Sequence, residues 1–477
     1  MSVERKAIAG LKWVGAAKLL AQVSSWVVTL VVVRLLVPGD YGLMALASLV
    51  VSVAAAAAEL GLGTSLVQAG AFDREQLARV AALALLLNLG MGLVVACGAP
   101  LAALFFNEPR LTAVIQVGAL HFVLAAFTTV PEALLLRDMD FRRLSAADLA
   151  AVLSGSLATL ALALVGAGVW SLVVGNLLAA LVRSSLLIRG RVVRPQFRFD
   201  RIARFAVFGG TLTASRLVWQ LTNQVDVLIA GRFLPKEAVG LYSMAVHLAT
   251  LPMQKISSVV NQVALPTIAR LQAERPRLQL RLLAALRLMM LVAIAPLWCL
   301  AAVAPEFVNV VLGPQWNGIA YPLRMISLLV PLKIASSVIS TSTVALGAAT
   351  LDLRNTMVNV VVLPIAFLVG VHWGIDGLAT AWAVGTGLVL GLTMPRMCSV
   401  IGMSLRQVVR AGAAPLLAGA ALVGTVLALR PLLASVAEPV RLGVLVFAGL
   451  AVYVAVVTLI EREVWDDVRR IAAADRG

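Results

Sequence analysis

Residues 16–49 read AAKLLAQVSSWVVTLVVVRLLVPGDYGLMALASL, and a related stretch occurs a second time in the chain. The second copy is residues 214–247, ASRLVWQLTNQVDVLIAGRFLPKEAVGLYSMAVH, displaced by 198 positions without a gap. Ten of the 34 positions are identical. The matches that carry weight in so apolar a chain are Gln22 with Gln220, Arg34 with Arg232, and Gly42 with Gly240. The chain therefore contains an internal repeat.

Each copy carries a polar stripe along an otherwise apolar segment. The stripe residues are Lys18, Gln22 and Ser25 in the first copy, and Arg216, Gln220 and Asn223 in the second. Their spacing is about one helical turn, which places each set on one face of a helix. Because such a face does not suit lipid, we predict that two similar half-molecules place the two stripes on opposite walls of one central cavity.

The composition is that of a membrane protein. The 477 residues are 61% hydrophobic and only 13% charged, with a mean hydropathy of +0.98. Such values lie far from the average of soluble proteins. The net charge of +16 is explained by positive loops beside membrane spans, so we expect no nucleic-acid partner.

The sequence contains no signature of catalysis or of metal binding. GxxxxGK[ST], HExxH and GxSxG are all absent. Cys97, Cys299 and Cys398 lie in apolar runs, without CxxC or Cys/His spacing. We therefore expect a protein that is not an enzyme, with no catalytic residue, no cofactor and no metal.

Apolar runs of about 20 residues, the length that crosses a bilayer, predict 14 transmembrane helices. Two of the junctions between them, 166–170 and 372–377, are predicted to be very short turns. Alternate sides of these helices carry 27 and seven Lys or Arg residues, the seven including Lys236, Arg430 and Arg441, and positive loops stay in the cytoplasm. Both termini are therefore expected in the cytoplasm. Since both repeat copies begin at an odd-numbered helix, the repeat is predicted to be parallel, with a pseudo-two-fold axis along the membrane normal.

The predicted fold is an all-α integral membrane bundle of two pseudo-symmetric six-helix lobes and two appended helices. We expect the N-terminal lobe at 1–188, a basic cytoplasmic linker at 189–202, the C-terminal lobe at 203–400, and the appended helices with a cytoplasmic tail at 401–477. Residues 183–204 contain seven arginines. They either fix the topology against anionic lipid head groups or recruit an anionic substrate or partner enzyme.

Ionisable residues inside predicted spans are the functional candidates, because burying a charge in lipid is costly. Lys18 lies about 10 Å into its helix, and the deeper ones are Arg216, Asp226, Lys255 and Lys333. Four cations against one acid predict a positive cavity that attracts an anion. Two interpretations of Asp226 stay open: a structural pair with a cation, or a carboxylate that couples transport to H+ or Na+.

Three acids, Glu59, Glu132 and Asp148, lie near the cytoplasmic ends of predicted helices. Snorkelling or capping is the simpler interpretation for them.

Several motifs resemble one known family. They are RLLVPGDYGLMALASLV at the end of the first predicted helix, ELGLGTSLVQ, and NQVDVLIAGRFLPKEAVGLYSMAVHLATLPMQ. They resemble the Wzx-type polysaccharide flippases, in the branch containing WzxC and GumJ, of the multidrug/oligosaccharidyl-lipid/polysaccharide exporter superfamily. The resemblance covers most of the chain.

This resemblance implies a V-shaped bundle like those of MATE transporters and MurJ, in the bacterial inner membrane. It implies a flippase that moves undecaprenyl-pyrophosphate-linked sugar repeat units from the cytoplasmic to the periplasmic leaflet, for exopolysaccharide or lipopolysaccharide synthesis. Alternating access would use an ion gradient. The family's cationic lumen carries over to Lys18, Arg216, Lys333 and Lys255. Membrane lipids and the polysaccharide polymerase machinery are the further partners implied.

Three side chains of the stripe, Gln22, Gln220 and Asn223, suit sugar hydroxyl groups because an amide both donates and accepts hydrogen bonds. We expect a monomer, since each chain supplies both walls of the cavity. The alternative is a multidrug exporter on the same fold, although cationic drugs would favour an acidic cavity. A membrane enzyme of the same pathway is a third reading, but the large non-cytoplasmic loop that it needs is absent.

Overall fold

The structure is a computed structural model that describes residues 25–26, 28–59, 74–189, 193–197, 203–251 and 275–460. All regular elements within these ranges are helices. Ten helical segments there are long and apolar enough to cross a membrane. The protein is therefore an all-helical, multi-pass membrane protein, as predicted. The number of 14 helices and the two-lobe layout stay predictions.

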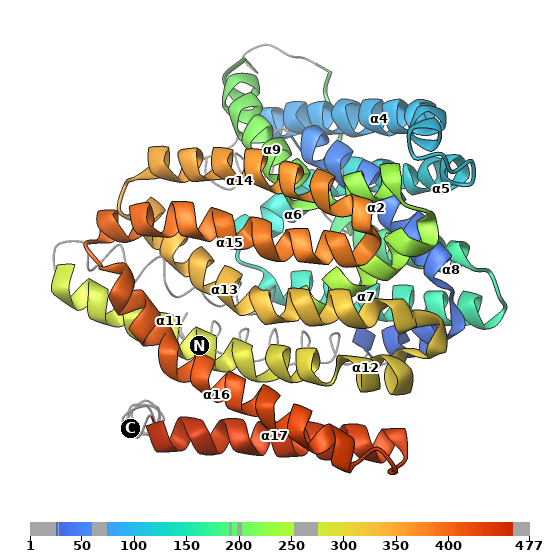
Figure 1. The fold of residues 1–477 in the computed structure, drawn as a ribbon. Coiled ribbons are helices and arrows are strands. Elements are labelled where there is room, and N and C mark those ends of the chain that lie inside the picture. The colour runs from blue at the N-terminus through green and yellow to red at the C-terminus, as the bar shows by residue number, and fades with distance from the viewer. Residues whose placement is uncertain are drawn as a thin grey trace, which may run out of the picture. The chain divides into compact units, whose positions relative to one another are not determined.

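The chain divides into two compact units, residues 1–240 and 241–477. The first contains seven helices with full bounds (Figure 1): α2 (Pro38–Ala58), α4 (Arg74–Phe105), α5 (Leu111–Gly118), α6 (Leu120–Arg137), α7 (Phe141–Leu164), α8 (Val169–Ile188) and α9 (Ala203–Phe233). This division groups α9 with the first unit, whereas the repeat makes α9 the start of the second copy. The predicted lobe boundaries follow the repeat in the sequence, and they stay a prediction.

In the first unit α7 and α8 form a tight hairpin, as the short junction at 166–170 predicted. Gly155 in α7 and Gly175 in α8 face each other so closely that a Cβ on either would lie about 3 Å from the other's carbonyl oxygen (2.9 and 3.0 Å). Small residues at a helix crossing let the two backbones approach, which is the usual packing device inside membranes.

Arg183 of α8 connects three helices of the first unit. Its guanidinium donates to both carboxylate oxygens of Glu132 in α6, at 2.7 and 2.9 Å, and to Asp148 in α7 at 2.8 Å. A planar guanidinium suits such a bidentate contact. Snorkelling or capping is therefore not the role of Glu132 and Asp148, which act as partners of one arginine.

The second unit is built mainly from long helices (Figure 1). They are α11 (Arg275–Ala302), α13 (Ala320–Ala345), α14 (Ala349–Gly370), α15 (Gly374–Ile401), α16 (Leu405–Leu432) and α17 (Glu438–Ile460). Between α11 and α13 lie α12 (Ala304–Phe307), the π-helix η1 (Val308–Leu312) and the 3₁₀ helix η2 (Pro314–Ile319), and η3 (Val371–Trp373) joins α14 to α15. A buried apolar cluster joins α11 to the appended pair α16 and α17, through residues such as Ile294, Leu422 and Leu445.

The two copies of the repeated turn contact each other reciprocally. A Cβ on Gly42 would lie 1.9 Å from the carbonyl oxygen of Lys236, and one on Gly240 would lie 1.8 Å from that of Pro38. A shift of 198 residues turns each of these contacts into the other. A two-fold axis requires such an exchange. The repeat found in the sequence therefore corresponds to a local two-fold contact, at which only glycine leaves room.

Candidate functional site

Helix α9 lies against α2 within the first unit, and Arg216 is the stripe residue that pairs with α2. Three contacts connect the two helices: Gly231 meets the Leu46 side chain, Gln224 donates to the hydroxyl of Ser52 at 2.7 Å, and Arg216 pairs with Glu59. Residue numbers fall along α9 as they rise along α2, so the two helices are antiparallel. The two polar contacts, at Arg216 and Gln224, lie in the middle of α9, and the contact of Gly231 lies near its C-terminal end.

Arg216 is one of the four cations that the sequence predicted in the cavity, and it forms an ion pair with Glu59 at the C-terminal end of α2. Seventeen residues separate Arg216 from Phe233, the last residue of α9, a length of about 26 Å. Arg216 is therefore level with the C-terminal end of α2. The pair is partly open to solvent, since the Arg216 side chain is 35% exposed and that of Glu59 is 62% exposed.

The other predicted residues of α9 have different environments. Gln220 is half-buried, and Asn223 is exposed and donates to the carbonyl oxygen of Trp219 at 2.8 Å. Asp226 is buried, at 6% exposure, and its carboxylate accepts from the backbone N–H of Val227 at 2.8 Å. Its burial distinguishes Asp226 from the open Arg216–Glu59 pair.

The polarity of α9 also appears in its hydropathy. This 31-residue helix is about 46 Å long, more than the ~30 Å of the hydrocarbon core. It is not among the ten described segments that qualify as spans, because residues 216–233, the continuous part with described side chains, contain three charged residues, Arg216, Asp226 and Arg232. A long helix of this kind suits a position where one face meets water or polar groups.

Lys333, the candidate in the second unit, lies in α13. Its ammonium group is 4.7 Å from the ring centroid of Trp382 in α15, and the Trp382 ring is buried. An aromatic face stabilises a cation electrostatically, most strongly where water is excluded. The three remaining candidates, Lys18, Gln22 and Lys255, lie outside the described residues.

The Arg216–Glu59 pair is suited to exchange its anion. Partly exposed ion pairs contribute little net free energy, because water competes for both charges. A pyrophosphate group carries more charge than one carboxylate and accepts two parallel hydrogen bonds from a guanidinium. The arrangement therefore offers a cation that is held in place but is available to a stronger anion.

The sequence reasoning missed Glu59, Ser52 and Gln224 as members of this site. A signal for Glu59 was present, because an arginine within a span needs a counter-charge at its own depth. Finding the depth required the pairing of α2 with α9, which the sequence alone did not provide. Among the described residues there is no group of three or more His, Cys, Asp or Glu side chains that could hold a metal ion.

Comparisons with known proteins place this chain in a family. The family described as "Polysaccharide biosynthesis protein" matches residues 31–321, well over half of the chain. Lipopolysaccharide biosynthesis protein WzxC of Escherichia coli is 26% identical over 292 residues, 58% of each chain. Succinoglycan biosynthesis transport protein ExoT of Rhizobium meliloti is 30% identical over 251 residues, 52% of this chain and 50% of ExoT. The matches thus span little more than half the length of these relatives.

Two solved transporter structures share the fold of this chain. The lipid II flippase MurJ in an inward closed conformation has a TM-score of 0.72 at 14% identity, covering 94% of this chain and 99% of its own. An inward-facing MATE family multidrug transporter of the MOP superfamily has a TM-score of 0.62 at 18% identity, covering 80% and 95%. The resemblance seen in the motifs is confirmed, and the chain belongs to the polysaccharide biosynthesis protein family.

Proposed function

We propose that this protein is a lipid-linked oligosaccharide flippase of the bacterial inner membrane. It moves undecaprenyl-pyrophosphate-linked sugar repeat units from the cytoplasmic to the periplasmic leaflet, for the synthesis of an exopolysaccharide or lipopolysaccharide. Relatives named for the synthesis or transport of such polymers support this proposal, as does a fold shared with a lipid flippase. The observation that carries it is the open ion pair of Arg216 on the polar face of α9.

In this mechanism the pyrophosphate of the substrate displaces Glu59 and binds the guanidinium of Arg216. Two phosphate charges cannot cross hydrocarbon unaided, and a fixed cation lowers that barrier. Lys18, Lys255 and Lys333 add positive charge to the predicted path. The polyprenyl tail stays in the lipid throughout, so only the head group needs a polar passage.

The sugar units of the substrate meet the amide groups of the stripe. Gln22, Gln220 and Asn223 each offer donors and an acceptor, as sugar hydroxyls require. Alternating access would be driven by H+ or Na+, with Asp226 as the coupling carboxylate. Asp226 is buried, at 6% exposure, which supports this role. Burial disfavours a charged carboxylate, so neutralising it with a proton or a bound Na+ is strongly favoured.

Substitutions of the ion pair test the proposal in cells that lack their own copy of the gene. We expect Arg216→Gln to reduce polymer export about tenfold or more, since it removes a charge-assisted bond to phosphate. Lipid-linked repeat units should then accumulate in the cytoplasmic leaflet. Glu59→Gln should retain export, because Arg216 is still available. Arg406→Gln, which removes an exposed cation at the start of α16, is the control.

Membrane insertion is measured for each variant by immunoblotting of the membrane fraction. Equal loss of export in Arg216→Gln and Glu59→Gln would mean that the pair has only a structural role. A multidrug exporter on the same fold predicts the opposite pattern. Glu59→Gln would then weaken resistance to cationic drugs, and polymer export would be normal in Arg216→Gln.

A further inference from the structure

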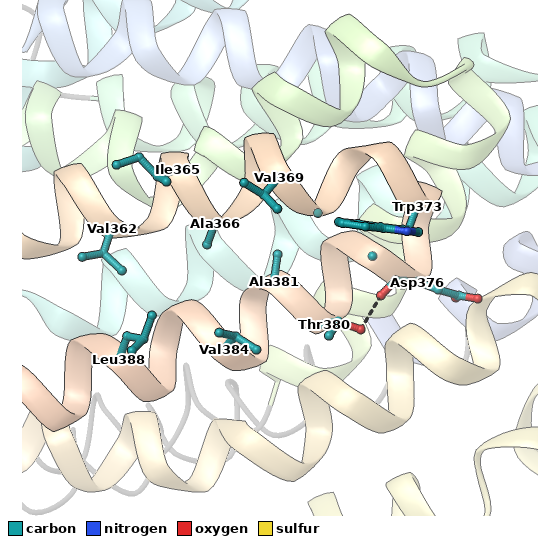
Figure 2. A pocket seen from close by; sticks show the side chains of 12 residues that line it. Val362, Ile365, Ala366, Val369, Trp373, Asp376, Thr380, Ala381, Val384 and Leu388 are labelled. Carbon is teal, nitrogen blue, oxygen red and sulfur yellow. Dashed lines mark hydrogen bonds between the residues drawn. The ribbon is translucent and has the colours of Figure 1, made fainter.

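A groove runs between α14 and α15 in the second unit, with a volume of about 630 Å³. Figure 2 shows its walls, formed by side chains of these two helices. All its lining residues except Asp376 and Thr380 are apolar or glycine. None of the residues assigned to the flippase site lines it. The groove is therefore a separate feature that the proposed transport step does not use.

The two helices diverge from a glycine contact beside their turn. A Cβ on Gly377 would lie 2.1 Å from the carbonyl oxygen of Gly370, and one on Gly370 would lie 2.5 Å from that of Gly377. Backbone therefore meets backbone at this end. Further along, larger side chains such as Ile365 and Leu388 form the walls (Figure 2). The groove is thus built into the hairpin.

The walls of the groove are open to the surroundings of the chain. Ile365, Val384 and Leu388 are 58%, 55% and 54% exposed. They belong to a segment, Thr350–Ile401, that is long and apolar enough to cross a membrane, and an apolar window of 18 residues within it is only 17% buried. Apolar side chains that a membrane protein leaves open within a span contact hydrocarbon. A lipid chain is the material that the bilayer supplies at this place.

The polar end of the groove lies at head-group level. α14 has 22 residues and is about 33 Å long, enough to cross the ~30 Å hydrocarbon core. Trp373 follows it and is 69% exposed, as expected of an aromatic residue at the membrane interface. A lipid chain in the groove would therefore have its head group beside Trp373 and the first turn of α15.

The charge at this end is negative. Asp376 is exposed, and its carboxylate has no hydrogen bond or ion pair within the described part of the chain. The hydroxyl of Thr380 donates to the backbone oxygen of Asp376 at 2.8 Å and lies 3.0 Å from the hydroxyl of Tyr321. Asp376 is the only charged residue among those that line the groove. A head group with an ammonium ion complements this end, whereas one with only phosphate is repelled.

We propose that the α14–α15 groove binds a phospholipid with an amine-bearing head group. One acyl chain lies between the two helices, and the ammonium group contacts the carboxylate of Asp376. Tyr321 and Thr380 provide hydroxyl groups beside the head. This lipid is a bound component of the transporter, distinct from the substrate, whose pyrophosphate would meet repulsion at Asp376.

The test uses the purified full-length protein with phosphatidylethanolamine or phosphatidylglycerol of identical acyl chains, and native mass spectrometry measures bound lipid. We expect the wild type to bind phosphatidylethanolamine about tenfold more tightly than phosphatidylglycerol. Asp376→Asn should abolish this preference while leaving binding of phosphatidylglycerol unchanged or stronger. Glu438→Gln, which removes an exposed carboxylate at the start of α17, should retain the preference.

Filling the groove provides the second arm. Ala366→Trp should weaken binding of both lipids, because the indole occupies the space of the acyl chain. Ile365→Trp changes an exposed wall residue and serves if Ala366→Trp does not fold. Equal binding of the two lipids by the wild type, or a preserved preference in Asp376→Asn, would overturn the proposal. The proposal would also be overturned if the wild type were a dimer that the tryptophan variants dissociate. A second copy of the chain, and not a lipid, would then occupy the groove.

Discussion

Glu108 and Glu306 are 198 residues apart, the displacement of the repeat, yet they have different partners. Glu108 follows α4 and pairs with Lys236 at 2.7 Å. Glu306 lies in α12 after α11, and its carboxylate is 2.8 Å from the guanidinium of Arg430 and 4.0 Å from that of Arg441. Both copies of the repeat thus contain the glutamate, but its cationic partner comes from different positions in the two copies.

The reason for the difference lies in the first copy. The residue equivalent to Lys236 is Pro38, which has no charge to offer. Arg430 in α16 and Arg441 in α17 supply it from the appended helices. Glu306 is also the more buried acid, with 3% of its side chain exposed against 15% for Glu108. Helices α16 and α17 thus provide the positive charge for Glu306, because the first copy of the repeat has Pro38 where the second has Lys236.

The largest effect should come from Glu306→Gln. Removing one partner of a buried ion pair leaves an uncompensated charge, at a cost of about 3–5 kcal/mol. Here Arg430 loses its acid, and among the described residues Arg441 keeps only Glu438 at 3.6 Å. We expect a strongly lowered melting temperature of the purified protein in detergent, with Glu108→Gln clearly less affected. Similar losses in the two variants would mean that burial and the appended helices do not distinguish the two sites.

Substitutions of Gly42 and Gly240 should lower stability equally, unlike those of the two glutamates. Gly42→Ala and Gly240→Ala each drive a Cβ into a backbone carbonyl, and overpacking of this kind costs about 1–3 kcal/mol or more. The two losses of melting temperature should be similar, and the double variant should fall short of their sum because both act on one contact. Gly98→Ala, where a Cβ meets nothing within 4 Å, is the control. A normal melting temperature for Gly42→Ala would contradict the contact.

The two arginines at Glu306 should differ from each other. Arg430 also donates to the carbonyl oxygen of Ala302 at 2.6 Å, whereas the Nε of Arg441 is 4.0 Å from the carboxylate. Loss of a hydrogen bond to a charged group costs about 1.5–3 kcal/mol. Arg430→Gln should therefore lower the melting temperature more than Arg441→Gln does. The reverse order would assign the main counter-charge to α17.

The smallest effect is the coupling between Glu108 and Lys236. A double-mutant cycle with Glu108→Gln and Lys236→Met, measured by thermal unfolding, should give about 0.5–1 kcal/mol, as for a pair near the surface. Coupling as large as that between Glu306 and Arg430 would show that the two sites are equivalent after all.

The repeat and the membrane class could be predicted because they rest on local signals. The glycines that match in the two copies, Gly42 and Gly240, are the ones that touch in the structure. Apolar runs predicted the spans because the bilayer demands them whatever the tertiary fold. The hairpin junctions at 166–170 and 372–377 were also predicted, since α8 begins at Val169 and α15 at Gly374.

The charge partners could not be predicted in the same way. The sequence marked Arg216 as a cavity cation but interpreted Glu59 as an acid at a helix end. Lys236, Arg430 and Arg441 were counted only among the few positive residues on the non-cytoplasmic side of the membrane. Each of these cations has an acidic partner in the structure. Pairing depends on which helices are neighbours, and residue spacing along one helix does not contain that information.

The sequence by itself determined a membrane protein with an internal repeat, because hydropathy and the turn glycines act within one segment at a time. Only the tertiary structure decided which acid neutralises which cation, and where α14 and α15 leave a groove. Ion pairs and grooves join residues far apart in the chain, and their stability depends on burial, which is a property of packing.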